Sequence, residues 1–127
     1  MRLYRVAVPV SDIAAARTFY ERVLGMAADD TVPTRLYFHC GGTILVTVDW
    51  TVEGRGGMRP NLEHVYLATT ELEAVHERAT TAAARDVTPI QVQPWGERSF
   101  YCADPDGNPL CFVDDTTLFL GQGAEWA

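Results

Sequence analysis

The order of apolar and polar residues divides the chain into two similar halves. In the first half, Leu3 to Val10 consists mostly of strand-forming residues, which predicts a β-strand. Ser11 or Asp12 can cap the helix predicted over residues 13–24, where apolar side chains recur at helical spacing. Gly25 follows directly and predicts a left-handed end to that helix.

The second half repeats this order. Residues 62–68 predict a strand, and Thr-Glu-Leu-Glu at 70–73 is a capping-box pattern that opens a helix reaching about residue 84. Residues 87–93 predict another short strand. Its counterpart in the first half falls in residues 26–34, where Pro33 breaks the pattern.

Each half then ends in a predicted β-hairpin. Residues 35–40 and 43–49 flank Gly41-Gly42, and residues 98–103 and 109–114 flank Asp-Pro-Asp-Gly-Asn at 104–108. Aspartate and proline favour the start of a tight turn, and glycine adopts the backbone conformation that a side chain would penalise.

The two halves align as a repeat, and a repeat of this kind decides the fold. A constant offset places Arg5 on His64. The hairpins place Val46 on Cys111 and Tyr37 on Phe100, if the second turn is two residues longer than the first.

We therefore predict an α+β protein of two strand–helix–strand–strand–strand modules, in which a curved, mostly antiparallel mixed sheet carries both helices on its convex side. The expected modules are residues 1–54 and 62–118, with a linker at 55–61 and a tail at 119–127. Neither module could bury its sheet face alone, so the two must pack on each other or on another chain.

Composition narrows the classes of function. The 127 residues carry a net charge of −7, which argues against nucleic acid and anionic membranes as partners. Three cysteines without C-x-x-C spacing indicate neither a disulfide framework nor a zinc knuckle. No apolar run is long enough for a membrane span or a leader, so we expect a cytoplasmic protein.

Four features occur together in a known group of proteins. They are the paired modules, Phe19-Tyr20 and Leu24-Gly25 at the end of the first helix, Pro94-Trp95-Gly96, and the turn at 104–108. In these features the chain resembles the vicinal oxygen chelate superfamily, which includes glyoxalase I, extradiol dioxygenases, fosfomycin-resistance enzymes and bleomycin-binding proteins. The resemblance implies the paired-module fold, but not one chemistry, because the superfamily contains enzymes and pure binding proteins.

The resemblance also implies four metal-ligand positions. They fall on Arg5, Val46, His64 and Cys111, and only His64 is a ligand type that the superfamily uses there. An arginine is always cationic, and a valine has no donor atom. His64 and Cys111 would be one ligand short of a catalytic zinc site. We therefore expect no metal and no other cofactor.

The same positions point to a ligand site. The candidate ligand-binding residues are Arg5, Tyr37, His64, Tyr66, Trp95 and Cys111. Arg5 and His64 are expected to face each other across one cleft, where the arginine would bind a carboxylate or carbonyl oxygen in place of a metal. Each candidate has a structural alternative: a satisfied histidine, a surface arginine, or a ring or thiol in the core. Glu97 and Arg98 could form an ion pair at the start of a strand.

Two functions from different classes remain. In the first, the protein has a degenerate metal site and binds a small molecule in the concave cleft. In the second, it is a glyoxalase-like lyase or dioxygenase-type enzyme acting on a small oxygen-bearing substrate. Such an enzyme would use a non-standard metal-ligand set, or would be metal-free with His64 as the catalytic acid–base. The resemblance implies a homodimer as well, and open sheet edges give an independent reason to expect one.

Overall fold

The computed structural model of the chain describes residues 1–121. Nine elements follow one another: β1 (Arg5–Val10), α1 (Ile13–Leu24), β2 (Arg35–Cys40), β3 (Thr43–Asp49), β4 (Val65–Thr69), α2 (Leu72–Thr81), β5 (Gln91–Val92), β6 (Arg98–Ala103) and β7 (Pro109–Asp114). Most of the tail predicted at 119–127 lies outside the described residues.

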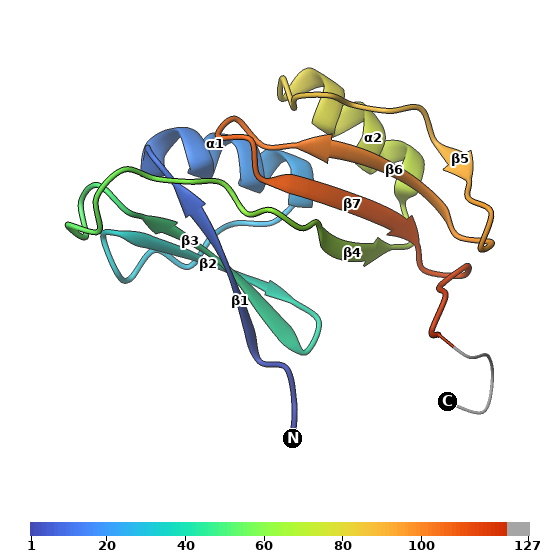
Figure 1. Ribbon diagram of the computed structural model, residues 1–127, viewed down its shortest axis with the longest axis horizontal. Helices are drawn as coiled ribbons and strands as arrows, with labels where there is room; N and C mark the ends of the chain where they lie inside the picture. Colours follow the sequence, from blue (N-terminus) through green and yellow to red (C-terminus); the bar gives the residue numbers. More distant parts are fainter. Residues whose placement is uncertain (122–127) are drawn as a thin grey trace.

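The strands form two mixed sheets, one in each module (Figure 1). The first has the order β1-β3-β2 and the second the order β4-β7-β6-β5. In each sheet the first strand of the module is parallel to the last, and the other pairs are antiparallel. The predicted α+β fold with two modules is confirmed.

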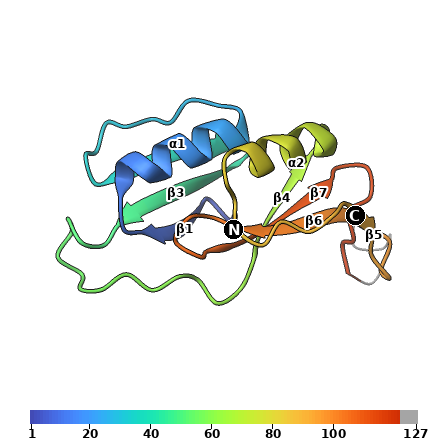
Figure 2. The same ribbon diagram turned by 90° about the horizontal axis from the view of Figure 1, so that it is seen from above.

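Both helices lie along the same side of the two sheets (Figure 2). They contact each other, and each packs on strands of its own module. One hydrophobic core results, with Tyr20, Phe38, Phe100 and Phe112 fully buried between helices and sheets. Neither α1 nor α2 covers the opposite side of either sheet, which is named the open face.

The ends of α1 agree with the prediction. Asp12 Oδ1 accepts hydrogen bonds from the main-chain N–H groups of Ala14 at 3.0 Å and Ala15 at 3.2 Å. Gly25 adopts a left-handed conformation with φ of 67° and ends the helix. These bonds satisfy helix-end donors that would otherwise lack a partner.

The capping box predicted for α2 is wrong. The N-cap residue is Glu71, and its side chain makes no capping bond. Thr69 instead accepts a hydrogen bond at its Oγ1 from Glu71 N at 3.0 Å. The carboxylate of Glu73 pairs with Arg98 of β6 rather than returning to the helix end. The helix stops at Thr81, short of the predicted residue 84.

Strand pairing confirms one repeat alignment and corrects the other. Ala7 pairs with Val46 as Tyr66 pairs with Cys111, which is the predicted offset. However, Val46 also pairs with Tyr37, whereas Cys111 pairs with Tyr101. Tyr101 is therefore the counterpart of Tyr37, and the second turn is longer by one residue rather than two. The slip matters because neighbouring strand residues face opposite sides of a sheet.

The strand expected in residues 26–34 is reduced to an isolated bridge between Asp29 and Tyr37. Oδ1 of Asp29 accepts hydrogen bonds from Thr31 N at 3.1 Å and Thr31 Oγ1 at 2.6 Å, which turns the chain away from the sheet. Within residues 1–121, neither helix has the length and apolar character needed to cross a lipid bilayer.

Candidate functional site

The open face of each sheet carries one half of the predicted site. By strand register, Arg5, Tyr37 and Val46 lie on the open face of the first sheet. Tyr66, Tyr101 and Cys111 lie on the open face of the second. Tyr37 and Val46 are equivalent in the repeat to Tyr101 and Cys111, and Ala7 is equivalent to Tyr66, but the two sets belong to different sheets.

A cavity of about 490 Å³ lies on the second sheet. It is lined by Tyr66, Leu67, Ala68, Trp95, Glu97, Val113, Leu118 and Phe119. The side chains of Tyr66, Trp95 and Phe119 are 60%, 46% and 55% exposed, so each retains ring surface that a ligand could cover. A cavity of this size with aromatic walls and one carboxylate is typical of small-molecule sites.

Glu97 is the single charged residue in this wall, and both oxygens of its carboxylate accept hydrogen bonds. Trp95 Nε1 donates a hydrogen bond to Oε1 at 2.8 Å, and Phe119 N donates one to Oε2 at 3.1 Å. The carboxylate thus fixes the indole and the segment after β7 around the cavity. Each oxygen keeps a further lone pair for a ligand donor.

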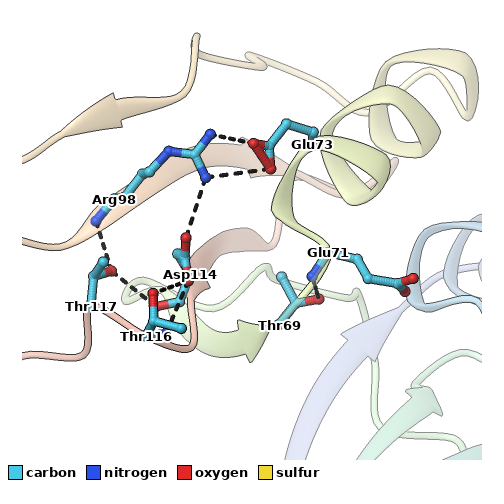
Figure 3. Close-up of polar contacts among 7 residues, drawn as sticks. All are labelled: Thr69, Glu71, Glu73, Arg98, Asp114, Thr116 and Thr117. Atoms are coloured by element: carbon cyan, nitrogen blue, oxygen red, sulfur yellow. Dashed lines mark hydrogen bonds and ion pairs between the residues drawn. The ribbon is translucent and has the colours of Figure 1, made fainter.

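Glu97 does not pair with Arg98, contrary to the expectation from sequence. Figure 3 shows that Arg98 reaches Glu73 at the start of α2 and Asp114 at the end of β7. The Arg98 side chain belongs to the helix side of β6, because strand alternation places it opposite Ser99. The cavity wall therefore contains a carboxylate and no basic side chain.

His64 lies beside Tyr101 and Tyr66 at the edge of this face. Its ring centroid is 5.0 Å from that of Tyr101, in an edge-on arrangement, and 6.0 Å from that of Tyr66. Burial raises the pKa of the neighbouring Cys111 thiol to about 11, so this cysteine is a neutral thiol near neutral pH. Burial also raises the pKa of the Tyr101 hydroxyl, and Cys111 raises it further.

Arg5 and Tyr37 do not line this cavity. The Arg5 guanidinium lies over the ring of Tyr4, 5.1 Å from its centroid, and the residue is exposed. Tyr37 is half-buried on β2. Neither this cavity nor a second one between the modules is lined by Arg5 or His64. A shared cleft between these two residues stays a prediction.

The four implied metal-ligand positions do not fit a metal. Arg5 and Val46 supply no ligand atom in the first sheet, and His64 and Cys111 supply two in the second. Catalytic zinc sites use three protein ligands, so His64 and Cys111 alone are one ligand short. Within residues 1–121, no group of three or more His, Cys, Asp or Glu side chains is arranged to hold a metal ion.

A second cavity, of about 590 Å³, lies between the modules at the free edge of β4. Its wall includes Val6, Leu45, Val65, Val75 and Arg78. The Arg78 guanidinium donates to the carbonyl oxygen of Val23 at 3.2 Å, so it closes the end of α1.

The structure thus brings together Tyr66, Trp95, His64 and Cys111 of the predicted set. Sequence reasoning missed Tyr101, because the hairpins were aligned with a slip of one residue. It also missed the roles of Glu97 and Phe119. Strand alternation from Tyr66 and Cys111 would have found Ala68 and Val113, but no local pattern links Phe119 to Glu97.

Comparisons with known proteins agree with this fold. A family model described as Glyoxalase/Bleomycin resistance protein/Dioxygenase superfamily matches residues 2–112. The uncharacterized protein YwbC of Bacillus subtilis (strain 168) is 29% identical over 125 residues, which cover 87% of this chain and 95% of that protein.

Solved structures show the same architecture. A glyoxalase-related enzyme from Fulvimarina pelagi superposes with a TM-score of 0.77 at 22% identity, covering 96% of this chain and 94% of that one. A lactoylglutathione lyase from Agrobacterium tumefaciens gives a TM-score of 0.67 at 21% identity, covering 91% and 94%. The chain belongs to the glyoxalase/bleomycin resistance protein/dioxygenase superfamily.

Proposed function

We propose that this protein binds a small organic molecule in the cavity on the open face of its second sheet, without using a metal. The observation that carries the proposal is the wall of that cavity, where the exposed rings of Tyr66, Trp95 and Phe119 surround Glu97. Aromatic rings offer large contact areas at low entropic cost. The ligand class that fits is an aromatic or apolar body with a hydrogen-bond donor directed at Glu97.

The residues at the implied ligand positions support a metal-free site. Arg5 and Val46 cannot ligate, which leaves only two ligand-type residues, His64 and Cys111, at the four positions. We also propose a cytoplasmic location, which is supported by three free cysteines.

The test is a thermal-shift screen of the purified protein against small aromatic amines, aldehydes, catechols and carboxylates, followed by calorimetry of the hits. Trp95→Ala and Glu97→Gln should each weaken binding at least several-fold. Val92→Ala is the matched control, because Val92 is exposed on β5 and does not line the cavity. Elemental analysis that found one metal ion per chain, or hits that bind all variants equally, would contradict the proposal.

A metal-free enzyme is the second candidate, and the position of His64 favours it. The imidazole packs edge-on against Tyr101 on the same face as Tyr66, where it could exchange a proton with a bound substrate. If the protein is an enzyme, His64→Ala should abolish turnover of a bound compound while binding of that compound persists. A pure binding protein leaves every hit chemically unchanged after long incubation.

A further inference from the structure

Glu97 is a carboxylate that has no cationic partner among residues 1–121. Its two oxygens accept hydrogen bonds from Trp95 Nε1 and Phe119 N, and both of these donors are neutral. Within that range every ion pair involves another acid, and Arg98 directs its guanidinium to the helix side of the sheet. Glu97 is half-buried, and charges that leave water are normally matched by an opposite charge.

The charge of Glu97 extends over the open face of the second sheet. Burial raises the pKa of the Tyr66 hydroxyl, and the charges of Cys111, Glu63 and Glu97 raise it further. After burial, Glu97 also contributes to the raised pKa of the Cys111 thiol. No basic side chain lines the cavity, so its wall has a negative potential that favours a cation.

The first sheet carries a cation at a position where the second sheet has none. Arg35 pairs with Val48 in the first sheet, and Ser99 pairs with Val113 in the second. Arg35 and Ser99 are therefore counterparts in the repeat. The guanidinium of Arg35 donates to Oε2 of Glu53 at 2.8 Å and forms an ion pair within the chain. Ser99 supplies no charge, so the carboxylate in the cavity wall is left for a cation from outside the chain.

Aromatic rings supply the rest of the surroundings that suit an organic cation. The rings of Tyr66, Trp95 and Phe119 line the same cavity as Glu97, and each is partly exposed. The face of an aromatic ring attracts a cation electrostatically, and tryptophan does so most strongly. The hydrogen bond from Trp95 Nε1 holds the indole beside the carboxylate of Glu97, so one cation can contact both.

We propose that the ligand of this cavity is an organic ammonium ion, a protonated secondary or tertiary amine. Its N–H group donates to Glu97, where each oxygen keeps a lone pair, and its alkyl or aryl groups contact the rings. The net charge of −7 adds a long-range attraction for cations. This inference rests on the function proposed above, because it names the ligand class of the same cavity.

Three probes of similar size separate the charge of the ligand from its shape. They are N,N-dimethylbenzylamine, which is a cation at neutral pH, the neutral N,N-dimethylbenzamide and the anion benzoate. Calorimetry at neutral pH should show that the amine binds about tenfold or more tightly than the amide, and that benzoate does not bind. Added salt should weaken binding of the amine but not of the amide, because salt screens the attraction between charges.

Two substitutions test the carboxylate and the rings separately. Glu97→Gln keeps a carbonyl oxygen for Trp95 Nε1 but removes the charge, so the amine should lose its advantage while the amide still binds. Glu77→Gln is the matched control, because Glu77 is exposed on α2 and its change alters the net charge equally. Phe119→Leu keeps an apolar side chain without a ring and should weaken binding of the amine more than of the amide.

The outcomes distinguish this inference from the function on which it rests. An amide that binds the wild type as tightly as the amine would overturn the ammonium proposal but leave a site for neutral small molecules. A preference for the amine that persists in Glu97→Gln would also overturn it, because the preference would then arise elsewhere. If no organic compound binds the protein at all, the function proposed above fails as well.

Discussion

The hydroxyl of Tyr20 in α1 donates a hydrogen bond of 2.6 Å to Oδ2 of Asp104, in the turn between β6 and β7. Both residues are completely buried. Oδ1 of the same carboxylate accepts from the main-chain N–H groups of Asp106 and Asn108, each at 2.9 Å. One aspartate thus shapes the turn of the second module and attaches it to the helix of the first.

Tyr20→Phe should destabilise the fold by roughly 1.5–3 kcal/mol, the usual cost of losing a hydrogen bond to a charged group, although Asp104 Oδ2 keeps its bond from Asn108 Nδ2. Urea unfolding measures this directly. Tyr4→Phe is the control, because Tyr4 is half exposed and its change should cost close to nothing. Equal stability of Tyr20→Phe and the wild type would show that the bond contributes little.

Stability should also fall in alkaline solution. Burial, with Asp104 as the next cause, raises the pKa of Tyr20 well above its ordinary value of 10.0. The unfolded chain therefore loses this proton first, and stability that is fully present below pH 10 is lost as the pH rises above it. Burial raises the pKa of Cys102 to about 12 from 9.0, which adds a decline that begins near pH 9. Tyr20→Phe should show a shallower loss above pH 10, and parallel curves for the two proteins would contradict this account.

The turn and the first helix were predictable because their signals are local. Asp12 and Gly25 cap α1 with atoms only a few residues away, and Asp104 bonds its own turn. The register of the second hairpin was not predictable with the same certainty. One residue of turn length decides whether Phe100 or Tyr101 faces the core, and both are aromatic.

Part of the candidate site was predictable, because strand alternation is also a local signal. Strand alternation placed Tyr66 and Cys111 on one face. The contact between Glu97 and Phe119 spans 22 residues and depends on where the chain turns after β7. Similarly, Arg98 forms its ion pair with Glu73 on α2 and not with its sequence neighbour Glu97. Such choices depend on packing, which a linear pattern does not record.

A second pH dependence should appear in acid. Hydrogen bonds from Arg35, with help from Thr34, lower the pKa of Glu53 from 4.5 to about 2. Its contribution to stability is present above pH 4.5 and is lost as the pH falls through about 2. Glu53→Gln should therefore lower the melting temperature at neutral pH and flatten its fall between pH 4.5 and 2. Glu77→Gln, an exposed change on α2, should follow the wild-type curve.

The three cysteines should differ in reactivity. Burial raises the pKa of all three thiols, but Cys102 and Cys111 are buried whereas Cys40 is only partly buried. An aromatic disulfide reagent at neutral pH should modify Cys40 first and the other two only on unfolding. Cys40→Ala should remove the early phase. Rapid reaction of all three thiols in the native protein would mean that the second sheet opens readily.

Asn108 should be the most sensitive polar position at the junction of the modules. Its Nδ2 donates to Pro9 O at 2.7 Å and to Asp104 Oδ2 at 2.9 Å, and its Oδ1 accepts from Asn61 N at 2.8 Å. Asn108→Ala removes the partners of Pro9 O and Asn61 N, while Asp104 Oδ2 keeps its bond from Tyr20, and should cost roughly 2–3 kcal/mol in urea unfolding. Asn61→Ala, which removes only the longer bond to Ala7 O, should cost less.

Asn108→Asp separates the hydrogen bonds from the shape of the side chain. The aspartate fills the same space, but it replaces the donor that faces Asp104 with a second carboxylate oxygen. Two carboxylates at this distance cannot both ionise without a large penalty, so one of them takes up a proton. Asn108→Asp should therefore be less stable than Asn108→Ala at neutral pH and should recover as the pH falls towards 4. If its stability did not depend on pH in this range, Asn108 would act through its shape and not as the hydrogen-bond donor that joins β1 to the turn.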